Sequence, residues 1–412
     1  MPQTTTGPSV SAAASVRRRP KDRKAQIALV AAQAFSERGY HAVGVDDIAA
    51  TLGISGPALY RHFPNKYALL VHAAMSTVGG LRSASDGARE VGQDDPDPTP
   101  EGQLDRVLRA LISTTVENRK TGGLYRWEGR YLRPTDRDLM RAEFGAVTQN
   151  IARPLLELRP DVTERDSVIL STAALSVIGS ITGHRAALAN RRIEKLLLRT
   201  AWAVLRCDLA AAEPALTTIE NPSAARGLAV TSKRELLLAE AVKIFNDRGY
   251  HESSIEEIGA AAGINASSVY RHFPSKADLL AAAFHRAADR LAMATAAALG
   301  ASADPEEALS RLSATYIDLA FGYPEVLSVY FAEIGNLPKH ERTNLRNVQR
   351  LHVEEWVHLL TAVRPELSAV EARFLVHAAL GQTLDVGRLM HFDTGAAARG
   401  RMQTLMLTVL HG

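Results

Sequence analysis

The sequence predicts an all-α protein made of two tandem helical units, and three observations support this prediction. The chain has 412 residues, which is too long for one hydrophobic core of ordinary size. It is 46% hydrophobic but only 6% aromatic, and it is rich in alanine and leucine, which favour helices. Residues 23–70 recur without a gap as residues 233–280, with 18 identities in 48 positions. A repeat of this length indicates a duplicated domain.

Composition and motifs exclude several classes of protein. Cys207 is the only cysteine, which excludes an intramolecular disulfide framework and a cysteine-based zinc site and predicts a cytoplasmic protein. No apolar stretch precedes the N-terminal basic run, and no uncharged apolar run reaches about 18 residues, so we expect neither signal peptide nor membrane span. No phosphate loop, nucleophile motif or metal-ligand spacing is present, so we expect no enzymatic activity, no cofactor and no metal.

The chain opens with a segment, residues 1–20, that we expect to be a disordered basic arm. Its first 16 residues are rich in serine, threonine and alanine. Arg18, Arg19 and Lys21 follow, and their position just ahead of a DNA-reading motif predicts contacts with phosphates or the minor groove. The alternative is a solvated tail.

Residues 21–70 carry the pattern of a helix-turn-helix. Helices are expected at about 22–38, 46–52 and 56–62, with a fourth from 65 to Arg82. Gly53 provides the tight turn between the second and third helices. Ser55 and Asn65 are predicted to cap the third and fourth helices.

This segment resembles the DNA-binding domain of the tetracycline-repressor family. The residues that carry the resemblance are Phe35, Gly39, Tyr40, Ile48, Ala49, Gly53, Ser55, Leu59-Tyr60-Arg61-His62-Phe63, Lys66, Leu69 and Leu70. The resemblance implies that Tyr60, His62 and Lys66 contact phosphates. It makes Ser55, Gly56 and Arg61 candidates for contacts with bases or the groove. Taken alone, His62 would more often be structural.

Residues 232–280 repeat this domain. Ser254 and Asn265 are predicted to cap its second and third helices, and Gly263 provides the turn. Carried over position by position, the candidate DNA contacts are Ser254, Asn265, Ala266, Tyr270, Arg271, His272 and Lys276.

A helical body for effector binding and dimerisation is expected after each head, at residues 71–212 and 281–412, with a linker at 213–231. Residues 83–100 are expected to form a loop because they are rich in glycine, aspartate and proline. Helices of the first body are expected at about 101–119, 123–132, 135–158, 164–189 and 191–212. Those of the second are expected at about 275–299, 305–321, 324–334, 338–362, 368–391 and 395–411.

Aromatic residues suggest where each body could hold an effector. In the first body Tyr125, Trp127, Arg130 and Tyr131 are candidates, with the arginine meeting an anion. The alternative is a helix whose charges face water or pair with one another. In the second body the candidates are Tyr323, Tyr330 and Phe331. Because arginine is sparser there, a second pocket should be the more apolar.

The last two helices of each body predict how the halves associate. Residues 164–212 are apolar on more than one face, so they must be buried on more than one face. Family members bury this pair against a second subunit as a four-helix bundle. Here residues 368–411 could supply the other pair, making one chain a pseudo-dimer. A homodimer of tandem chains with four heads is the alternative.

The two heads differ in sequence and in charge. Ser55-Gly56-Pro57-Ala58 stands opposite Asn265-Ala266-Ser267-Ser268, so the half-sites should differ and the operator should not be a palindrome. Residues 17–72 carry nine basic and four acidic side chains, whereas residues 229–285 carry six and seven. We therefore expect the first head to dominate DNA affinity.

The sequence thus predicts a DNA-binding repressor that a small, lipid-like effector releases. The tandem architecture resembles that of regulators of mammalian-cell-entry lipid-import operons in mycobacteria, which implies a fatty acid, acyl thioester or sterol as effector. A transcriptional activator of the same fold is the closest alternative. A sensor whose second head no longer binds DNA is another.

Overall fold

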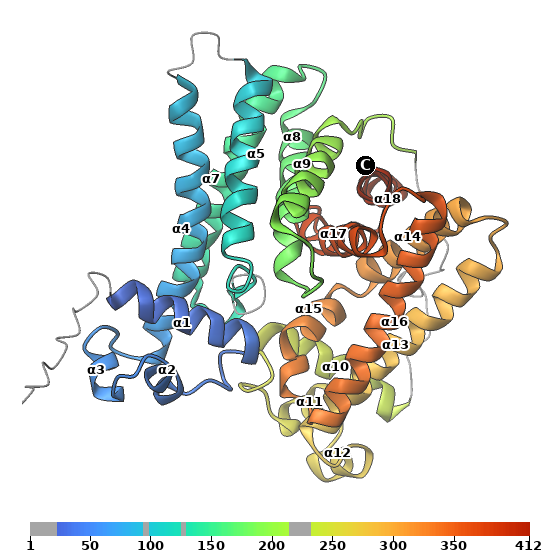
Figure 1. Ribbon diagram of the computed structural model, residues 1–412. Coiled ribbons are helices and arrows are strands. Elements are labelled where there is room, and N and C mark those ends of the chain that lie inside the picture. Colours follow the sequence, from blue (N-terminus) through green and yellow to red (C-terminus); the bar gives the residue numbers. More distant parts are fainter. Residues whose placement is uncertain (1–22, 94–98, 125–128, 214–231) are drawn as a thin grey trace, which may run out of the picture.

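The computed structural model describes residues 23–93, 99–124, 129–213 and 232–412, and every regular element in these ranges is a helix (Figure 1). The basic-arm candidates, together with Tyr125, Trp127 and nearly all of the predicted linker, lie outside the described residues. Within those ranges no helix is long and apolar enough to cross a membrane. The same ranges hold no cluster of side chains arranged to bind a metal.

Each unit consists of a small head followed by a helical body. The first unit comprises α1 (Arg23–Arg38), α2 (Val45–Thr51), α3 (Gly56–Tyr60), α4 (Lys66–Gln93), α5 (Pro100–Glu117), η1 (Gly129–Tyr131), α7 (Pro134–Leu158), α8 (Glu164–Gly179), η2 (Ser180–Thr182) and α9 (Asn190–Arg206). The second comprises α10 (Lys233–Arg248), α11 (Ile255–Ala261), α12 (Ala266–His272), α13 (Lys276–Gly300), α14 (Pro305–Gly322), α15 (Pro324–Glu333), η3 (Ile334–Asn336), α16 (Lys339–Val363), α17 (Ala369–Leu389) and α18 (Ala396–His411).

Three predicted boundaries are wrong, and one of them is the end of the helix expected at 191–212, which stops at Arg206. The loop expected at 83–100 is helical as far as Gln93, because α4 packs against α5 and α7 and places Leu81 and Ala88 on the main core. The helix expected to reach residue 189 ends at Gly179. Beyond Gly179 the Arg119 guanidinium donates hydrogen bonds to the carbonyls of Ile181, His184 and Ala186. These carbonyls therefore have hydrogen-bond partners without a continued helix.

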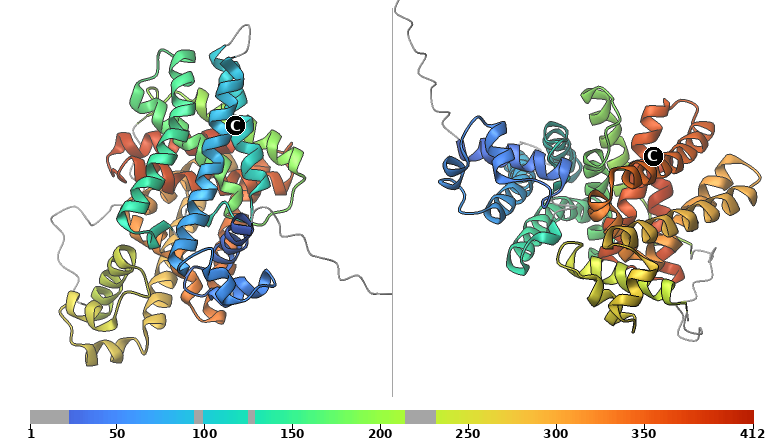
Figure 2. Two further views of the ribbon diagram at one scale, coloured as in Figure 1. Left: turned by 90° about the vertical axis from the view of Figure 1, so that its left-hand side faces the viewer. Right: turned by 90° about the horizontal axis from the view of Figure 1, so that it is seen from below.

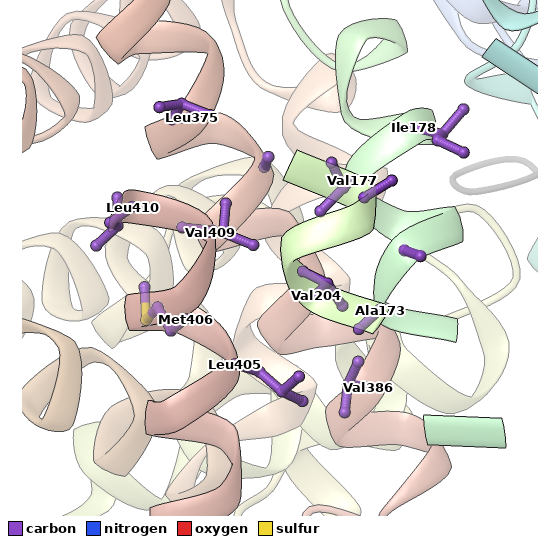
Figure 3. Close-up of a cluster of buried hydrophobic side chains, with 14 of the residues drawn as sticks. Ala173, Val177, Ile178, Val204, Leu375, Val386, Leu405, Met406, Val409 and Leu410 are labelled. Carbon is purple, nitrogen blue, oxygen red and sulfur yellow. The ribbon is translucent and has the colours of Figure 1, made fainter. Parts of the chain in front are cut away.

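A four-helix bundle joins the two halves of the chain. Helices α8 and α9 of the first half pack against α17 and α18 of the second, as the sequence predicted. Their apolar side chains form one continuous core with the rest of both bodies. Figure 3 shows Val177 and Val204 of the first half close to Val409 of the second. The bodies are therefore halves of one folded domain.

Two ion pairs across the bundle obey a pseudo-two-fold relation. Asp166 near the start of α8 pairs with Arg401 on α18. Glu371, at the same position of α17, pairs with Arg192 on α9, with 2.9 Å between Oε1 and Nη2. In each pair the acid comes from one half and the arginine from the other. The acids stand at equivalent positions, whereas Arg192 is the third residue of α9 and Arg401 the sixth of α18, so the two-fold relation holds for the helices and not for each residue.

Both heads lie at the same end of the molecule, below the bundle in Figure 1 and at the lower end of the left view in Figure 2. They touch through equivalent residues, because the rings of His41 and His251 lie 4.1 Å apart between centroids. Burial, followed by the neighbouring His251 and Lys66, lowers the pKa of His41 to about 4. The His41 ring is therefore neutral at pH 7.

Candidate DNA-reading heads and ligand cavity

Side-chain caps fix the start of both recognition helices, as predicted. The Ala58 N–H donates to Ser55 Oγ at 3.4 Å at the start of α3. The Ser268 N–H donates to Asn265 Oδ1 at 2.9 Å at the start of α12. The turns before them need glycine, since Gly53 has φ +64° and Gly263 has φ +67°. Each head is thus a helix-turn-helix with a defined reading helix.

The residues predicted to touch DNA lie on one exposed stretch of each head. Tyr60 and Tyr270 leave 49% and 48% of their surface open, although large aromatic side chains are usually more buried. The arginine and histidine that follow each tyrosine are exposed as well. A phenol, a guanidinium and an imidazole in succession form a donor-rich edge suited to phosphate oxygens.

The two heads present their arginine differently. In the second head Arg271 Nη2 donates to the Ser268 hydroxyl at 2.6 Å, which holds the guanidinium against its own helix. In the first head the equivalent of Ser268 is Ala58, which has no hydroxyl. Arg61 therefore lacks this tether and is the more available of the two for a base or phosphate.

Lys66 and Lys276 have a structural role that the sequence did not reveal. Lys276 Nζ donates to the carbonyls of Tyr250 and Ser253 at 2.5 and 2.7 Å and lies over the Tyr250 ring. Lys66 Nζ contacts the His41 carbonyl at 3.5 Å and lies over the Tyr40 ring. Each lysine thus ties the loop after the first helix to the start of the fourth helix. Their contact with DNA stays a prediction.

Arg130 and Tyr131 do not line the large cavity of this protein, and their contacts match the alternative in which the charges pair within the protein. Their contact with an effector stays a prediction. Arg130 Nη1 donates to Glu333 Oε1 at 2.7 Å, and the Tyr131 hydroxyl contacts both carboxylate oxygens of Glu333. The Tyr250 N–H and the Asn336 side chain also donate to Glu333, whose side chain is completely buried. The charge of Arg130 is used within the protein, because a buried carboxylate needs a partner.

Glu333 therefore connects three parts of the molecule, which we call the Glu333 junction. The carboxylate belongs to the end of α15 in the second body. Arg130 and Tyr131 belong to η1 of the first body, and Tyr250 belongs to the second head. Sequence reasoning missed this junction because Arg130 and Glu333 are 203 positions apart.

The second body encloses a cavity of about 580 Å³, which lies within the range of small-molecule sites. The predicted effector residues Tyr323, Tyr330 and Phe331 all line it. The rest of the lining comes mainly from apolar side chains of α13, α14, α16 and α17. In the part of the first body that the structure describes, the corresponding region holds a cavity of about 40 Å³, with room for a few waters.

The cavity also reaches the first half of the chain. Ser180 and Gly183, in and just after η2, contribute to its lining together with His377 of α17. The His377 ring stacks on the His184 ring with 4.3 Å between centroids and 10° between planes. Burial lowers the pKa of His377 to about 4 and that of His184 to about 2, so both rings are neutral at pH 7.

The heads match a known family twice. A model described as bacterial regulatory proteins of the tetR family covers residues 27–73 and again residues 237–283. Both heads are tetR-family domains. The two matches coincide with the two helix-turn-helix heads seen in the structure, so the tandem arrangement predicted from the sequence is confirmed.

Individual relatives of the tetR family match parts of the chain. The HTH-type transcriptional activator FasR of Mycolicibacterium smegmatis is 42% identical over 72 residues, 16% of this chain and 33% of FasR. The HTH-type transcriptional repressor NicS of Pseudomonas putida is 29% identical over 142 residues, 34% of this chain and 65% of NicS. The chain thus spans less than two thirds of the length of either relative.

Among solved structures, the TetR family transcriptional regulator PfmR from Thermus thermophilus is 27% identical. The match covers 44% of this chain and 97% of PfmR, with a TM-score of 0.38.

Proposed function

We propose that the chain is a DNA-binding transcriptional repressor that acts as a single-chain pseudo-dimer and is released by a lipid-like effector. The observation that carries the proposal is the four-helix bundle formed within one chain from α8, α9, α17 and α18. This bundle places two tetR-family heads at one end of the molecule, where two half-sites of an operator could be read together (Figure 1).

The operator that fits this arrangement is not a palindrome. Base choice depends on the residues that open each recognition helix, and Ser55-Gly56 and Asn265-Ala266 differ in size and in hydrogen-bonding groups. The first head also has the greater positive charge and the untethered Arg61. It supplies most of the affinity, and the second head adds specificity.

The contacts of α15 suggest how the binding of an effector in the cavity is transmitted to the two heads. Leu327, Tyr330 and Phe331 of this helix line the cavity, and the helix also packs against α10 of the second head. Glu333 at its end binds Arg130 and Tyr131 of the first half. A ligand that shifts α15 therefore acts on the second head directly and on the first half through the Glu333 junction.

The effector class follows from the apolar lining of the cavity, which suits a lipid, an acyl chain or a sterol. Repression and activation of transcription both occur among the proteins that match this chain, since FasR is named an activator and NicS a repressor. Measuring transcripts of the neighbouring genes in a deletion strain decides between the two. Repression predicts that these transcripts rise, and activation predicts that they fall.

Sedimentation of the full chain on DNA from its own upstream region tests the pseudo-dimer. One chain per asymmetric site is expected, and two chains per site would replace the proposal with a homodimer that has four heads. Matched variants rank the heads in the same assay. Arg61→Ala should weaken binding by about tenfold or more, whereas Arg271→Ala should weaken it less. Equal losses would contradict the ranking.

A further inference from the structure

Two polar side chains of the second-body cavity lie next to each other. Tyr316 of α14 and His352 of α16 both line the cavity, with rings 6.3 Å apart between centroids and 22° between planes. Tyr316 is only 7% exposed. Its hydroxyl makes no hydrogen bond with any described residue, although a buried hydroxyl normally has a partner. It is therefore available to an occupant of the cavity.

Hydrogen bonding fixes which nitrogen of His352 carries its proton. Trp356 Nε1–H can only donate, and it donates to His352 Nε2 at 3.1 Å. Nε2 is therefore the acceptor, and the proton of the neutral ring is on Nδ1. Burial lowers the pKa of His352 to about 4, so the ring is neutral at pH 7. Tyr316 and His352 thus offer the cavity a phenol and an imidazole N–H donor, and neither group carries a charge.

Charged side chains lie elsewhere in the lining. Among the described lining residues only Arg290 and Glu355 carry a full charge, and both are exposed. Arg290 already lies over the Tyr323 ring. Because the two charges have opposite signs, they give the lining no net attraction for an anion. A carboxylate placed beside Tyr316 would lose its hydration without gaining a cation.

We propose that the cavity takes an uncharged, mainly apolar molecule whose single hydroxyl or carbonyl group is hydrogen-bonded by Tyr316 and His352. This inference rests on the proposed function only in treating the cavity as the effector site. The ligand would also contact the first half, since Ser180 and Gly183 belong to the same lining. Tyr316 and His352 select for the polar group, and the alanine-rich wall of α13 accepts the apolar body.

Calorimetric titration of the full chain with matched probes tests the ligand class. Cetyl alcohol, palmitate and hexadecane share one chain length and differ only in the terminal group, and progesterone adds a rigid uncharged ketone. We expect cetyl alcohol or progesterone to bind at least about tenfold more tightly than palmitate and hexadecane. Whichever of the two binds more tightly shows whether a linear or a ring-shaped body is preferred.

Substitutions then assign the contact. Tyr316→Phe keeps the ring and removes only the hydroxyl, so it should weaken the uncharged polar probe about tenfold and leave palmitate and hexadecane unchanged. Tyr323→Phe is the matched control, because it removes a hydroxyl from the Arg290 side of the same cavity. The proposal is overturned if palmitate binds most tightly, if neither uncharged polar probe binds, or if Tyr316→Phe and Tyr323→Phe behave alike.

The operator affinity of each variant is measured separately, without any probe. Tyr316→Phe should bind DNA like the unaltered chain, since Tyr316 lies outside both heads. If the unaltered chain binds DNA but does not prefer an uncharged polar probe, only the ligand class is rejected. Failure of the unaltered chain to bind DNA rejects the proposed function while leaving the calorimetric result meaningful.

Discussion

The two bodies have corresponding helices but differ in how tightly these helices pack. The first body holds the small cavity, and we call it the closed body. The second body holds the large cavity, and we call it the hollow body. In the first body Asn150 of α7 donates to Ser85 Oγ and Asp86 Oδ1 of α4 and accepts from Arg89 Nη1, at 2.7–2.9 Å. Arg82 pairs with Asp86 in the same group. This polar network holds α4 against α7 and closes the space between them.

The hollow body lacks this network, because the positions equivalent to its polar residues carry other side chains. With α4 and α13 aligned through the 210-residue repeat, the equivalents of Arg82, Asp86 and Arg89 are Ala292, Ala296 and Leu299. Helices α7 and α16 are both 25 residues long, and when they are aligned on their first residues Glu355 stands for Asn150. All four replacements line the large cavity. A ligand site can therefore arise from unchanged helices when bridging polar side chains are lost.

The largest expected effect comes from breaking the Glu333 junction, which connects the closed body to the hollow one. Glu333→Ala removes the partner of Arg130, whose side chain is 19% exposed, and also leaves the Tyr250 N–H without its acceptor. Removing one member of a buried ion pair costs about 3–5 kcal/mol. We expect a loss of that size in the free energy of unfolding, measured by urea titration.

Glu366→Ala serves as the control for this loss. Glu366 also pairs with an arginine, Arg364, but its side chain is 60% exposed. Its removal should leave stability close to that of the unaltered chain. Similar midpoints for the two variants would show that the Glu333 junction adds no stability.

A pair of equivalent substitutions tests the comparison itself. Asn150→Ala should cost about 1–3 kcal/mol of stability, because it leaves Arg89 without its hydrogen-bond partner and Asp86 with Arg82 as its remaining partner. Glu355→Ala, at the same position of the hollow body, should change stability by no more than about 0.5 kcal/mol. The contrast between closed and hollow bodies fails if both variants lose the same amount in thermal unfolding.

The heads and the bundle could be predicted from the sequence because their signals are local. Ser55, Asn65 and Asn265 each cap the helix that follows them, as expected. The apolar faces of residues 164–212 and 368–411 required burial, and the bundle provides it. In each case residues a few positions apart contain the whole signal.

The site details could not be predicted because they depend on distant partners. Nothing near Arg130 in the sequence indicates that Glu333 will neutralise it. Gly87, near the end of α4, disfavours a helix locally, and packing against α5 and α7 overcomes that preference. The cavity lining comes from several helices, so no single segment carries its signal.

Filling part of the cavity should make the packing of the hollow body more like that of the closed body. Ala296→Leu places three more carbon atoms in the cavity at the position of Asp86. Filling an apolar cavity typically adds about 0.5–2 kcal/mol of stability, so the melting temperature should rise. Binding of cetyl alcohol and progesterone should fall in the same variant. A melting temperature below that of the unaltered chain would indicate that the cavity cannot accept the side chain.

A further expected effect is a dependence of stability on pH that comes from two buried histidines of the cavity. The pKa values of His352 and His377 are lowered to about 4 in the folded chain, against an ordinary value of 6.5. Between these values the unfolded chain binds more protons, so stability falls as pH falls from about 6.5 to 4. Melting temperatures measured across this range should decline, and His377→Gln should lessen the decline. An unchanged slope would contradict the assignment.

The covalent connection between the halves has a consequence for how the two halves can evolve. In a homodimer every codon change appears twice, once in each copy, so one body could not carry Asp86 while the other carries Ala296 at the corresponding position. Here each position across the pseudo-two-fold axis is encoded separately. The reciprocal ion pairs Asp166–Arg401 and Glu371–Arg192 each take their acid from a different half. The closed and hollow bodies show what a duplicated gene is free to change one half at a time.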